Sequence, residues 1–446
     1  MSEKTKKIFL IASILIIFVI LVILIIINTL SKTKKIDDNK ITTDEIEGVG
    51  VIGNEAFGRD SKFIKIEDMA IYNIVENKLN KYINDCYETS NDLVLDVLDE
   101  EYVLENNITK DNVLEKIGKI DNYCTFNIEQ AKQYNLYGNY AILVTGRIKS
   151  KDETKYDSNK RDWVLVKNNK GTDQKQSYFI KFNFENMAYS IKPITEENLN
   201  DIIEKNDISE IKVTKNKNNT FTYKEVKNDQ IISKYILKFK TILNEDSTKI
   251  YDLLDDEYKK AKFSSTDEFN KYIKDNYDNF MKINLYKYSV EKKNDYKEYI
   301  FTDTYENYYI IKETAAMEYK ILLDPYTIKV DSSIKKYDKS NEKEKVEICI
   351  GYIKQALNNR DYKYIYNHLN SDFKTQNFKS INEVEEYIEK NFYKKNGVEL
   401  IRYDQQSDMY VYLLKLKNLE DSSQNKQFKI SLKLLENREF EMLMSI

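Results

Sequence analysis

The sequence VLDVLDEEY at Val94–Tyr102 recurs twice, as IYDLLDDEY at Ile250–Tyr258 and as IYNHLNSDF at Ile365–Phe373. The three stretches align without gaps, and each ends in an aromatic residue. Self-similarity within one chain is the sequence signature of a structural unit that is used more than once. We therefore expect three copies of one unit.

An amphipathic helix is predicted downstream of each stretch. Each closing aromatic residue is followed, at the same distance, by an isoleucine with another apolar residue four positions before it. The i, i+4 spacing places both on one helix face. The pairs are Val113 with Ile117, Phe269 with Ile273, and Val384 with Ile388.

The start of this helix is marked by a capping box in two copies. Ser265–Glu268 and Ser380–Glu383 both read S-x-x-E, in which the serine and the glutamate cap each other's backbone N–H groups. Thr109 has the matching place in the first copy, and Asn112 stands where the glutamate would complete the box.

Each copy also has an earlier amphipathic helix and later strands, which β-branched and aromatic residues indicate. The earlier helices are marked by Leu79, Ile83 and Cys86, by Ile232, Ile236, Phe239 and Leu243, and by Cys349, Ile353, Ala356 and Leu357. The predicted strands include Ala141–Val144, Tyr178–Phe182, Tyr308–Ile311, Tyr319–Leu323, Tyr410–Leu414 and Phe428–Leu432, and a turn with a returning strand closes each copy, at Asp324-Pro325 in the second.

Helices followed by an antiparallel sheet, in units of about 100 to 130 residues, predict an α+β fold. This order resembles the nuclear transport factor 2-like, or cystatin-like, cone fold. In that fold one long and two short helices pack into the concave face of a bent sheet. The resemblance covers nearly all of residues 66–446 and implies three tandem cone domains.

The segment Ile8–Ile27 reads IFLIASILIIFVILVILIII, without a charge or a proline. A helix of this length spans about 30 Å, the thickness of the bilayer core. A cleavable signal peptide has a shorter apolar region and a small-residue cleavage site. We therefore predict an uncleaved single-pass signal anchor that contacts the lipid bilayer through Ile8–Ile27.

The orientation of this anchor is not decided by its flanking charges. Lys4, Lys6 and Lys7 precede it, and three lysines, Lys32, Lys34 and Lys35, follow it, so the positive-inside count is a tie. Because long C-terminal domains translocate largely regardless of charge, we expect a cytoplasmic N-terminus and extracytoplasmic domains in the cell membrane.

These features predict eight regions along the chain. Each is defined by a change from apolar or periodic sequence to polar sequence. The regions are a cytoplasmic tail (1–7), the transmembrane anchor (8–30), a polar linker (31–65), cone domain 1 (66–195), a linker (196–222), cone domain 2 (223–331), a linker (332–343) and cone domain 3 (344–446).

The composition excludes several classes of protein. The chain has 70 basic and 74 acidic residues in mixed order, and no basic stripe predicts contact with nucleic acid. The abundance of residues that AT-rich codons encode indicates a low-GC, bacterial genome. No CxxC motif occurs, and Cys86, Cys124 and Cys349 are interpreted as small buried apolar residues, although Cys86 and Cys124 could pair.

The stretch Gly48–Gly53 fits the pattern G-x-G-x-x-G of dinucleotide-binding proteins. That pattern needs a strand before it and a helix after it, so that the pyrophosphate meets the helix N-terminus. The preceding Thr42–Glu47 is acidic and no convincing helix follows, so we interpret the stretch as linker and expect no cofactor.

No residue pattern predicts catalysis. The acidic clusters Asp99–Glu101 and Asp255–Glu257 could attract a cation, but calcium needs more ligands in a tight loop, so we expect solvated helix ends and no metal site. The single histidine, His368, stands where the other copies have Val97 and Leu253, which favours a structural position. The tyrosines on the strands are interpreted as strand formers.

Three functions remain open, and we favour the first. It is a non-enzymatic envelope scaffold with protein partners in the membrane or envelope, because the layout resembles the bitopic subunits of bacterial conjugation or secretion channels. The second is a surface-binding module for a wall polymer, a peptide or a small ligand, which exposed tyrosines facing a cavity would favour. The third, least favoured, is an isomerase- or dehydratase-type cone enzyme. The alternative that the chain forms a homo-oligomer stays open.

Overall fold

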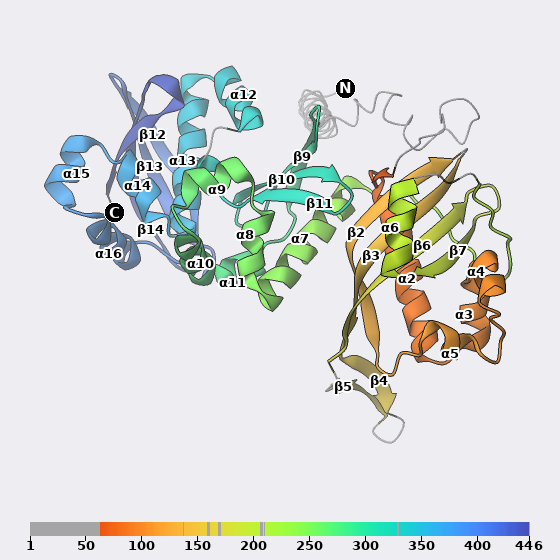
Figure 1. Cartoon of the computed structure of the whole chain (residues 1–446). Coiled ribbons are helices and arrows are strands. Elements are labelled where there is room, and N and C mark those ends of the chain that lie inside the picture. Colours follow the sequence, from red (N-terminus) through yellow and green to blue (C-terminus); the bar gives the residue numbers. More distant parts are fainter. Residues whose placement is uncertain are drawn as a thin grey trace, which may run out of the picture. The chain divides into compact units, whose positions relative to one another are not determined.

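The computed structural model describes residues 63–445, except for 137, 158–160, 168–170, 206–207, 209 and 328–329. The predicted cytoplasmic tail, the membrane anchor and Gly48–Gly53 lie outside these residues. Within the described part, no helix is long and apolar enough to cross a membrane. The described residues form helices and antiparallel sheets, which confirms the predicted α+β class (Figure 1).

The described chain passes through three successive segments in which helices precede a sheet. In the first segment, β1 (Ile64–Lys65) comes before the helices, and β6 pairs with β3 and β7 in antiparallel fashion. Its five-stranded sheet has the order β1-β2-β3-β6-β7. The remaining elements are α2 (Met69–Tyr87), α3 (Asn91–Val97), α4 (Glu100–Glu105), α5 (Val113–Ile117), β2 (Cys124–Leu136), β3 (Asn139–Ser150), β4 (Glu153–Asp157), β5 (Asp162–Val166), β6 (Asp173–Asn183), β7 (Ala188–Ile194) and α6 (Glu196–Lys205).

The second segment has a four-stranded antiparallel sheet in the order β11-β10-β9-β8. Its elements are α7 (Asn228–Glu245), η2 (Ser247–Lys249), α8 (Ile250–Leu253), α9 (Asp256–Lys262), α10 (Thr266–Asp275), α11 (Tyr277–Met281), β8 (Lys287–Lys292), β9 (Lys297–Thr302), β10 (Tyr308–Ala315), β11 (Glu318–Leu322) and η3 (Pro325–Thr327).

The third segment has a four-stranded antiparallel sheet in the order β12-β13-β14-β15. Its elements are α12 (Asp331–Lys339), α13 (Glu342–Asn358), α14 (Tyr362–His368), α15 (Ser371–Asn377), α16 (Ile381–Asn391), β12 (Asn396–Gln406), β13 (Met409–Asn418), β14 (Asn425–Leu434), η4 (Glu436–Arg438) and β15 (Phe440–Ser445).

The chain divides into two compact units. The described residues up to Ile64, with 85–124 and 132–221, form the first unit. Residues 65–84 and 125–131, and the chain from Thr222 onward, form the second. The second and third segments therefore belong to one unit.

The repeated sequence stretches occupy equivalent places in the three segments. The leucine at the fifth position of each stretch forms an isolated parallel bridge to the last strand of its own sheet. The next residue donates its backbone N–H to the carbonyl of that same strand residue, at 2.9 to 3.2 Å. The bridges are Leu98 to Ile191, Leu254 to Ile321 and Leu369 to Met442.

The residue after each bridging leucine also caps the next short helix. Asp99 accepts a hydrogen bond from the Tyr102 N–H, and Asp255 accepts from the Glu257 and Tyr258 N–H groups. Asn370 does the same at the start of α15. The repeated stretch thus ends one helix, touches the sheet and starts another helix within a few residues.

The predicted helix starts at Ser265 and Ser380 are confirmed. Each serine hydroxyl accepts from the N–H three residues later, as an N-cap does. The glutamate of each box reaches one residue further back than expected, to the N–H of Ser264 or Lys379. In the first segment, α5 starts only at Val113, and the Asn112 side chain accepts instead from the Thr109 N–H.

The prediction of the closing strand in the second segment is wrong. The bridge from Leu254 identifies β11 as the closing strand, whereas the sequence pattern predicted a closing strand after Asp324-Pro325. Pro325 opens the 3-10 helix η3 instead. Neither β8 nor β9 was named among the predicted strands; the residues of β8 are all exposed or half-buried and so show no apolar alternation.

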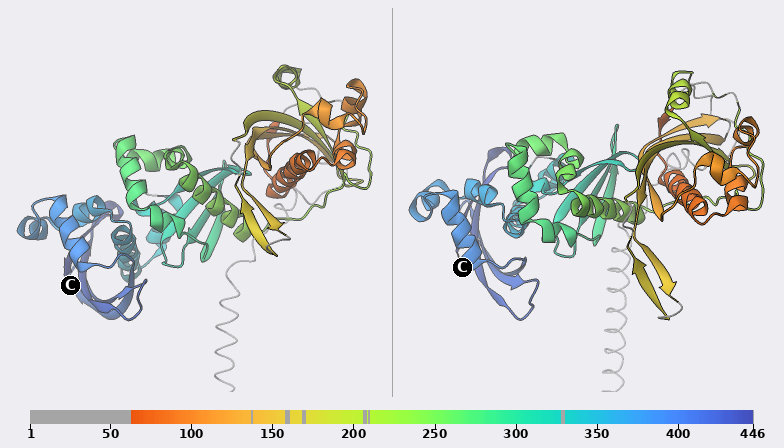
Figure 2. Two further views of the ribbon diagram at one scale, coloured as in Figure 1. Left: turned by 90° about the horizontal axis from the view of Figure 1, so that it is seen from below. Right: turned by 60° about the horizontal axis from the view of Figure 1, so that its bottom comes forward.

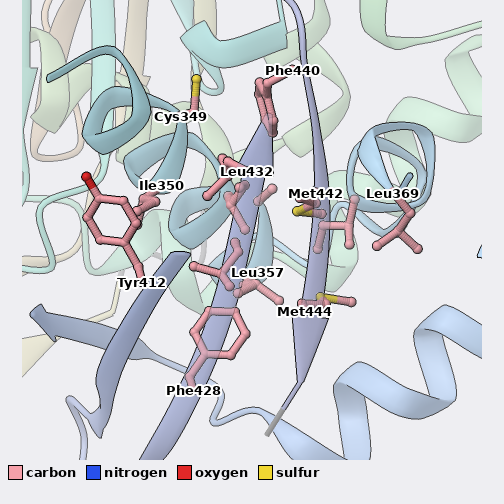
Figure 3. Close-up of a cluster of buried hydrophobic side chains, with 14 of the residues drawn as sticks. Cys349, Ile350, Leu357, Leu369, Tyr412, Phe428, Leu432, Phe440, Met442 and Met444 are labelled. Atoms are coloured by element: carbon pink, nitrogen blue, oxygen red, sulfur yellow. The ribbon is translucent and has the colours of Figure 1, made fainter. Parts of the chain in front are cut away.

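The third segment has a continuous apolar core between its helices and its sheet. Along β13 the side chains alternate between half-buried and buried positions, as expected for a strand with one face on a core. Figure 3 shows part of this core, with side chains from α13, β13, β14 and β15 converging. The cluster includes Cys349, Ile353, Ala356 and Leu357, the predicted apolar face of α13.

Two stretches predicted as linkers pack against the fold. In the stretch 196–222, the side chains of Ile211 and Val213 are buried in a cluster with residues of β2, β3, β6 and β7, and α6 packs against that cluster. In the stretch 332–343, α12 places Tyr337 in the core of the third segment.

The cap at Asp255 gives a direct test of the repeated stretch. The substitution Asp255→Ala removes two cap hydrogen bonds and the ion pair with Lys312, whose Nζ lies 2.8 Å away. We expect the free energy of unfolding to fall by about 2–3 kcal/mol, measured by urea denaturation.

The control is Asp256→Ala, because the neighbouring carboxylate is exposed and its ion pair with Lys259 lies within its own helix. It should leave the denaturation midpoint nearly unchanged. Equal effects of the two substitutions would contradict a specific role for the cap.

Candidate interaction sites

The acidic clusters are used for capping. Asp99 and Asp255, the first residues of the two clusters, are buried and pair with Lys181 at 3.1 Å and Lys312 at 2.8 Å. The other cluster residues lie exposed on α4 and α9. Within the described residues, no group of three or more His, Cys, Asp or Glu side chains is placed to hold a metal ion.

His368 is a packed side chain at the end of α14. Its ring stacks on Phe440 with centroids 4.4 Å apart, and its Nδ1 lies 2.8 Å from the Tyr364 carbonyl. Its Nε2 lies 3.8 Å from a carboxylate oxygen of Glu439. Burial lowers the pKa of His368, so the imidazole is neutral at pH 7.

A cavity of about 270 Å³ lies beside His368 and is also lined by Cys349. Burial raises the pKa of the Cys349 thiol to about 12, so this thiol is protonated at neutral pH and is a poor nucleophile. All three cysteines of the chain are buried, as expected for small apolar residues, and none forms a disulfide.

A buried polar face on α13 joins the third segment to the second. The Gln355 side chain accepts from the Tyr308 N–H at 3.0 Å and donates to the Tyr308 carbonyl at 2.8 Å. Asn358 donates to Asn307 at 3.4 Å, and Lys354 donates to the carbonyls of Tyr305 and Glu306 at 3.3 Å. The helix therefore binds the β9–β10 turn through side chains and backbone together.

The same helix face also organises its own segment. Asn358 Oδ1 accepts from the Asn396 backbone N–H at 2.7 Å, where β12 begins. Asn358 is fully buried and is therefore held by partners on both sides. Buried amides that are satisfied in this way hold one geometry, because every alternative leaves a polar group without a partner.

A second polar cluster at the junction surrounds the carboxylate of Asp324, which is completely buried. Within the second segment, this carboxylate accepts from the Tyr258 hydroxyl at 2.9 Å and from Tyr272 and Lys262. From the third segment, Asn359 donates to it. Asp324, which stands two residues after the end of β11, is thus bonded to both segments.

Lys262 links this cluster to Asp361, which caps α14. Its Nζ lies 3.0 Å from Asp361, and the hydroxyl of Tyr326 donates to the same carboxylate at 3.2 Å. Burial alone would lower the pKa of Lys262, but the attraction of Asp324 and Asp361 outweighs it and the pKa is raised. Burial would likewise raise the pKa of Asp361, but the attraction of Lys262 outweighs burial, so this pKa is lowered. The pair stays ionised at neutral pH.

Lys395 is a buried lysine at the same junction. Its Nζ lies 5.3 Å from the centre of the Tyr305 ring. Burial lowers the pKa of Lys395 to about 8, against weaker opposing effects of Asp303 and Glu420. The charged form therefore costs stability in the folded state.

The hairpin of β4 and β5 has an exposed apolar face in the first unit. Among the described residues the two strands pair with each other and with no other strand, and Tyr156 lies opposite Trp163 in their register. Because side chains alternate along a strand, Leu165 shares the face of Trp163. Figures 1 and 2 show this hairpin extending away from the five-stranded sheet.

The side chains on this hairpin face are unusually open to solvent. Trp163, the only tryptophan of the chain, is 66% exposed, Leu165 is 60% exposed and Tyr156 is 55% exposed. The rings of Tyr156 and Trp163 pack edge to face with centroids 5.7 Å apart. We call Tyr156, Trp163 and Leu165 the hairpin face.

Sequence reasoning missed both the junction and the hairpin face. The polar residues of α13 read as the solvated side of an amphipathic helix, and only the packed segments show that they are buried. The dipeptide Asp162-Trp163 gave a weak signal, since a lone tryptophan in a polar stretch is often exposed for contact.

No family model matches the chain, and no curated protein matches it. Among solved structures, the chain is similar to one described as an Ntf2-like protein involved in plasmid conjugation, with 13% identity and a TM-score of 0.13. The similarity covers 56% of this chain and 99% of that one. It is too weak to assign a fold or a role.

Loss of the Asp324 charge should loosen the junction. In Asp324→Asn, Lys262 loses one of its two carboxylate partners inside the protein, and we expect the free energy of unfolding to fall by about 3–5 kcal/mol. The measurement is urea denaturation at pH 7.

The matched control is Asp338→Asn, which breaks a two-pronged ion pair with Arg438 at the surface, with both contacts at 2.8 Å. A surface pair contributes little, so its midpoint should barely move. If both substitutions act alike, burial of the Asp324 cluster does not stabilise the junction.

Lys395 predicts a pH dependence of stability. Between pH 8 and 10.5 the unfolded chain holds the Lys395 proton and the folded chain does not, so stability should rise with pH across this window. Between pH 7 and pH 10, the free energy of unfolding of the wild type should rise by up to about 3 kcal/mol relative to that of Lys395→Met.

The test compares denaturation midpoints of the two proteins at both pH values, since all other titrations are shared. At pH 7 the Lys395→Met protein should be the more stable of the two. A difference that does not change with pH would show that Lys395 is not held in a depressed-pKa environment.

Proposed function

We propose that the chain is a non-enzymatic scaffold of the cell envelope. In this proposal residues 8–27 anchor it in the membrane, and the three segments are tandem cone domains of the nuclear transport factor 2-like type outside the cell membrane. They make assembly contacts, as in a conjugation or secretion complex.

The hairpin face is the observation that carries this proposal. Monomeric proteins rarely expose a contiguous group of large apolar side chains, and such groups mark interaction sites. Tryptophan and tyrosine dominate the binding energy of protein interfaces. The two-stranded ribbon carries Trp163, Leu165 and Tyr156 together on one face, and the exposure of these side chains does not stabilise the ribbon.

A hairpin of two strands is marginally stable by itself. A partner that covers one face would supply the burial that the ribbon lacks. We therefore infer that the hairpin face binds a partner protein of the envelope.

The junction of the second and third segments supports the same role. A scaffold needs fixed spacing between its contact surfaces. Asn358, Gln355 and Asp324 are buried and hydrogen-bonded across the junction, which favours one rigid arrangement of the two segments.

The test is photo-cross-linking in cells, with a photoreactive amino acid in place of Leu165 on the affinity-tagged full chain. We expect a discrete cross-linked envelope protein at this position. The control places the same photoreactive amino acid at position 104, because the side chain of Leu104 is even more exposed but stands alone on α4.

A second comparison uses Leu165→Ser and Leu104→Ser with a general cross-linker. The first should reduce recovery of the partner several-fold, and the second should not. A protein that runs as a lone monomer after solubilisation, without cross-linked neighbours at Leu165, would exclude the scaffold role. Cross-links between two copies would identify a homo-oligomer in place of another protein.

A second candidate function is a surface-binding module for a wall polymer or small ligand. Tyr286 and Tyr308 are exposed and line a cavity, as this function requires.

A further inference from the structure

A groove of about 330 Å³ lies between the second and third segments. Ile350, Gly351 and Lys354 of α13 line it together with Val398 of β12 and Tyr412 of β13. Residues of the second segment complete the rim. Ligand pockets in proteins start at about this volume, which suits a ligand of one or two rings.

Gly351 leaves one wall of the groove bare. Glycine in a helix interior weakens the helix relative to alanine. Packing does not require it here, since a Cβ at this position would have no heavy atom within 4 Å. The missing side chain opens space over α13 in which a ligand ring can lie.

Tyr412 carries a buried hydroxyl that the described residues do not satisfy. The residue is 1% exposed, and its hydroxyl has no hydrogen-bond partner within the described part of the chain. In Figure 3 its oxygen points away from Phe428, Leu432 and Met442, on the side of Ile350. Phenylalanine would fill the same core volume without the cost of an unpaired hydroxyl.

The rim of the groove combines aromatic rings with balanced charges. Tyr286 is 54% exposed and Tyr308 is also exposed, and the ammonium groups of Lys287 and Lys336 lie over one face of these rings, 5.0 and 5.7 Å from their centres. Lys287 and Lys354 are matched by Glu306 and Glu347, and Lys354 pairs with Glu306 at 3.3 Å. This balance does not favour a ligand of either net charge.

We propose that this groove binds a neutral saccharide of one or two rings. The apolar face of a sugar ring would pack on the tyrosine rings and over Gly351, and one of its hydroxyls would satisfy the hydroxyl of Tyr412 once the side chains that cover this hydroxyl move aside. This proposal rests on the second candidate function and names its site and ligand class. The saccharide proposal is independent of the scaffold proposal that rests on the hairpin face. Cross-linking tests the scaffold role, whereas titration tests saccharide binding.

The experiment titrates the full chain in detergent with di-N-acetylchitobiose, a neutral disaccharide, and follows binding by saturation-transfer difference NMR. N-acetylmuramic acid, which carries a carboxylate, is the charged comparison. We expect the neutral probe to bind and the charged probe to bind more weakly.

Two variants at one position separate the groove from the fold. Gly351→Ala adds a methyl group in open space and should leave the affinity within about twofold. Gly351→Trp fills the groove and should abolish binding, while the unfolding midpoint stays close to that of the Ala variant.

A third variant tests the hydroxyl. Tyr412→Phe should weaken binding about tenfold, which corresponds to ~1.4 kcal/mol. The unfolding midpoint of the free protein should stay the same or rise, because an unpaired buried hydroxyl is removed. A purely structural hydroxyl would give a lower midpoint and unchanged binding.

Three further results would overturn the proposal. They are no binding of the neutral disaccharide by the wild type, equal binding by Gly351→Trp and Gly351→Ala, and tighter binding of the charged probe than of the neutral one. Each can occur while the cross-links at the hairpin face persist, so the two proposals can fail separately.

Discussion

The buried carboxylate of Asp324 is the constraint around which the junction of the second and third segments is arranged. A carboxylate without exposure is tolerated only when its oxygens are hydrogen-bonded and its charge is compensated. Lys262 and the tyrosines supply part of this from one segment, and Asn359 supplies the rest from the other. Because the donors come from both sides, separating the segments would leave a buried charge underbonded.

The groove and the cavity beside His368 are consequences of that junction. Both are lined by residues of the second and the third segments, so their shapes depend on the fixed placement of α13 against the β9–β10 turn. The polar groups inside the junction are satisfied by protein. The Tyr412 hydroxyl and the hairpin face are different, since their burial or bonding is incomplete within the described chain. Sites of this kind favour external partners.

The strand error in the second segment shows where a sequence pattern stops being informative. Strands such as β13 alternate between a core and solvent and are easily identified. Strand β8 has no buried face, and its Lys287 and Lys292 stand on a sheet edge, so its sequence resembles a loop. The predicted strands of this segment began only at Tyr308, and the predicted closing strand was placed after Asp324-Pro325. The parallel bridge from Leu254 to β11 corrects the assignment.

The sequence by itself determined the repeated stretches, the helix starts at Ser265 and Ser380, the apolar face of α13 and the α+β class. These depend on local periodicity and on hydrogen bonds between residues a few positions apart, which sequence spacing records. Only the tertiary structure decided that Gln355 and Asn358 are buried, that Asp99 and Asp255 are buried caps, and that Trp163 is exposed. The reason is physical: the burial of a polar or aromatic side chain depends on what another part of the chain places beside it.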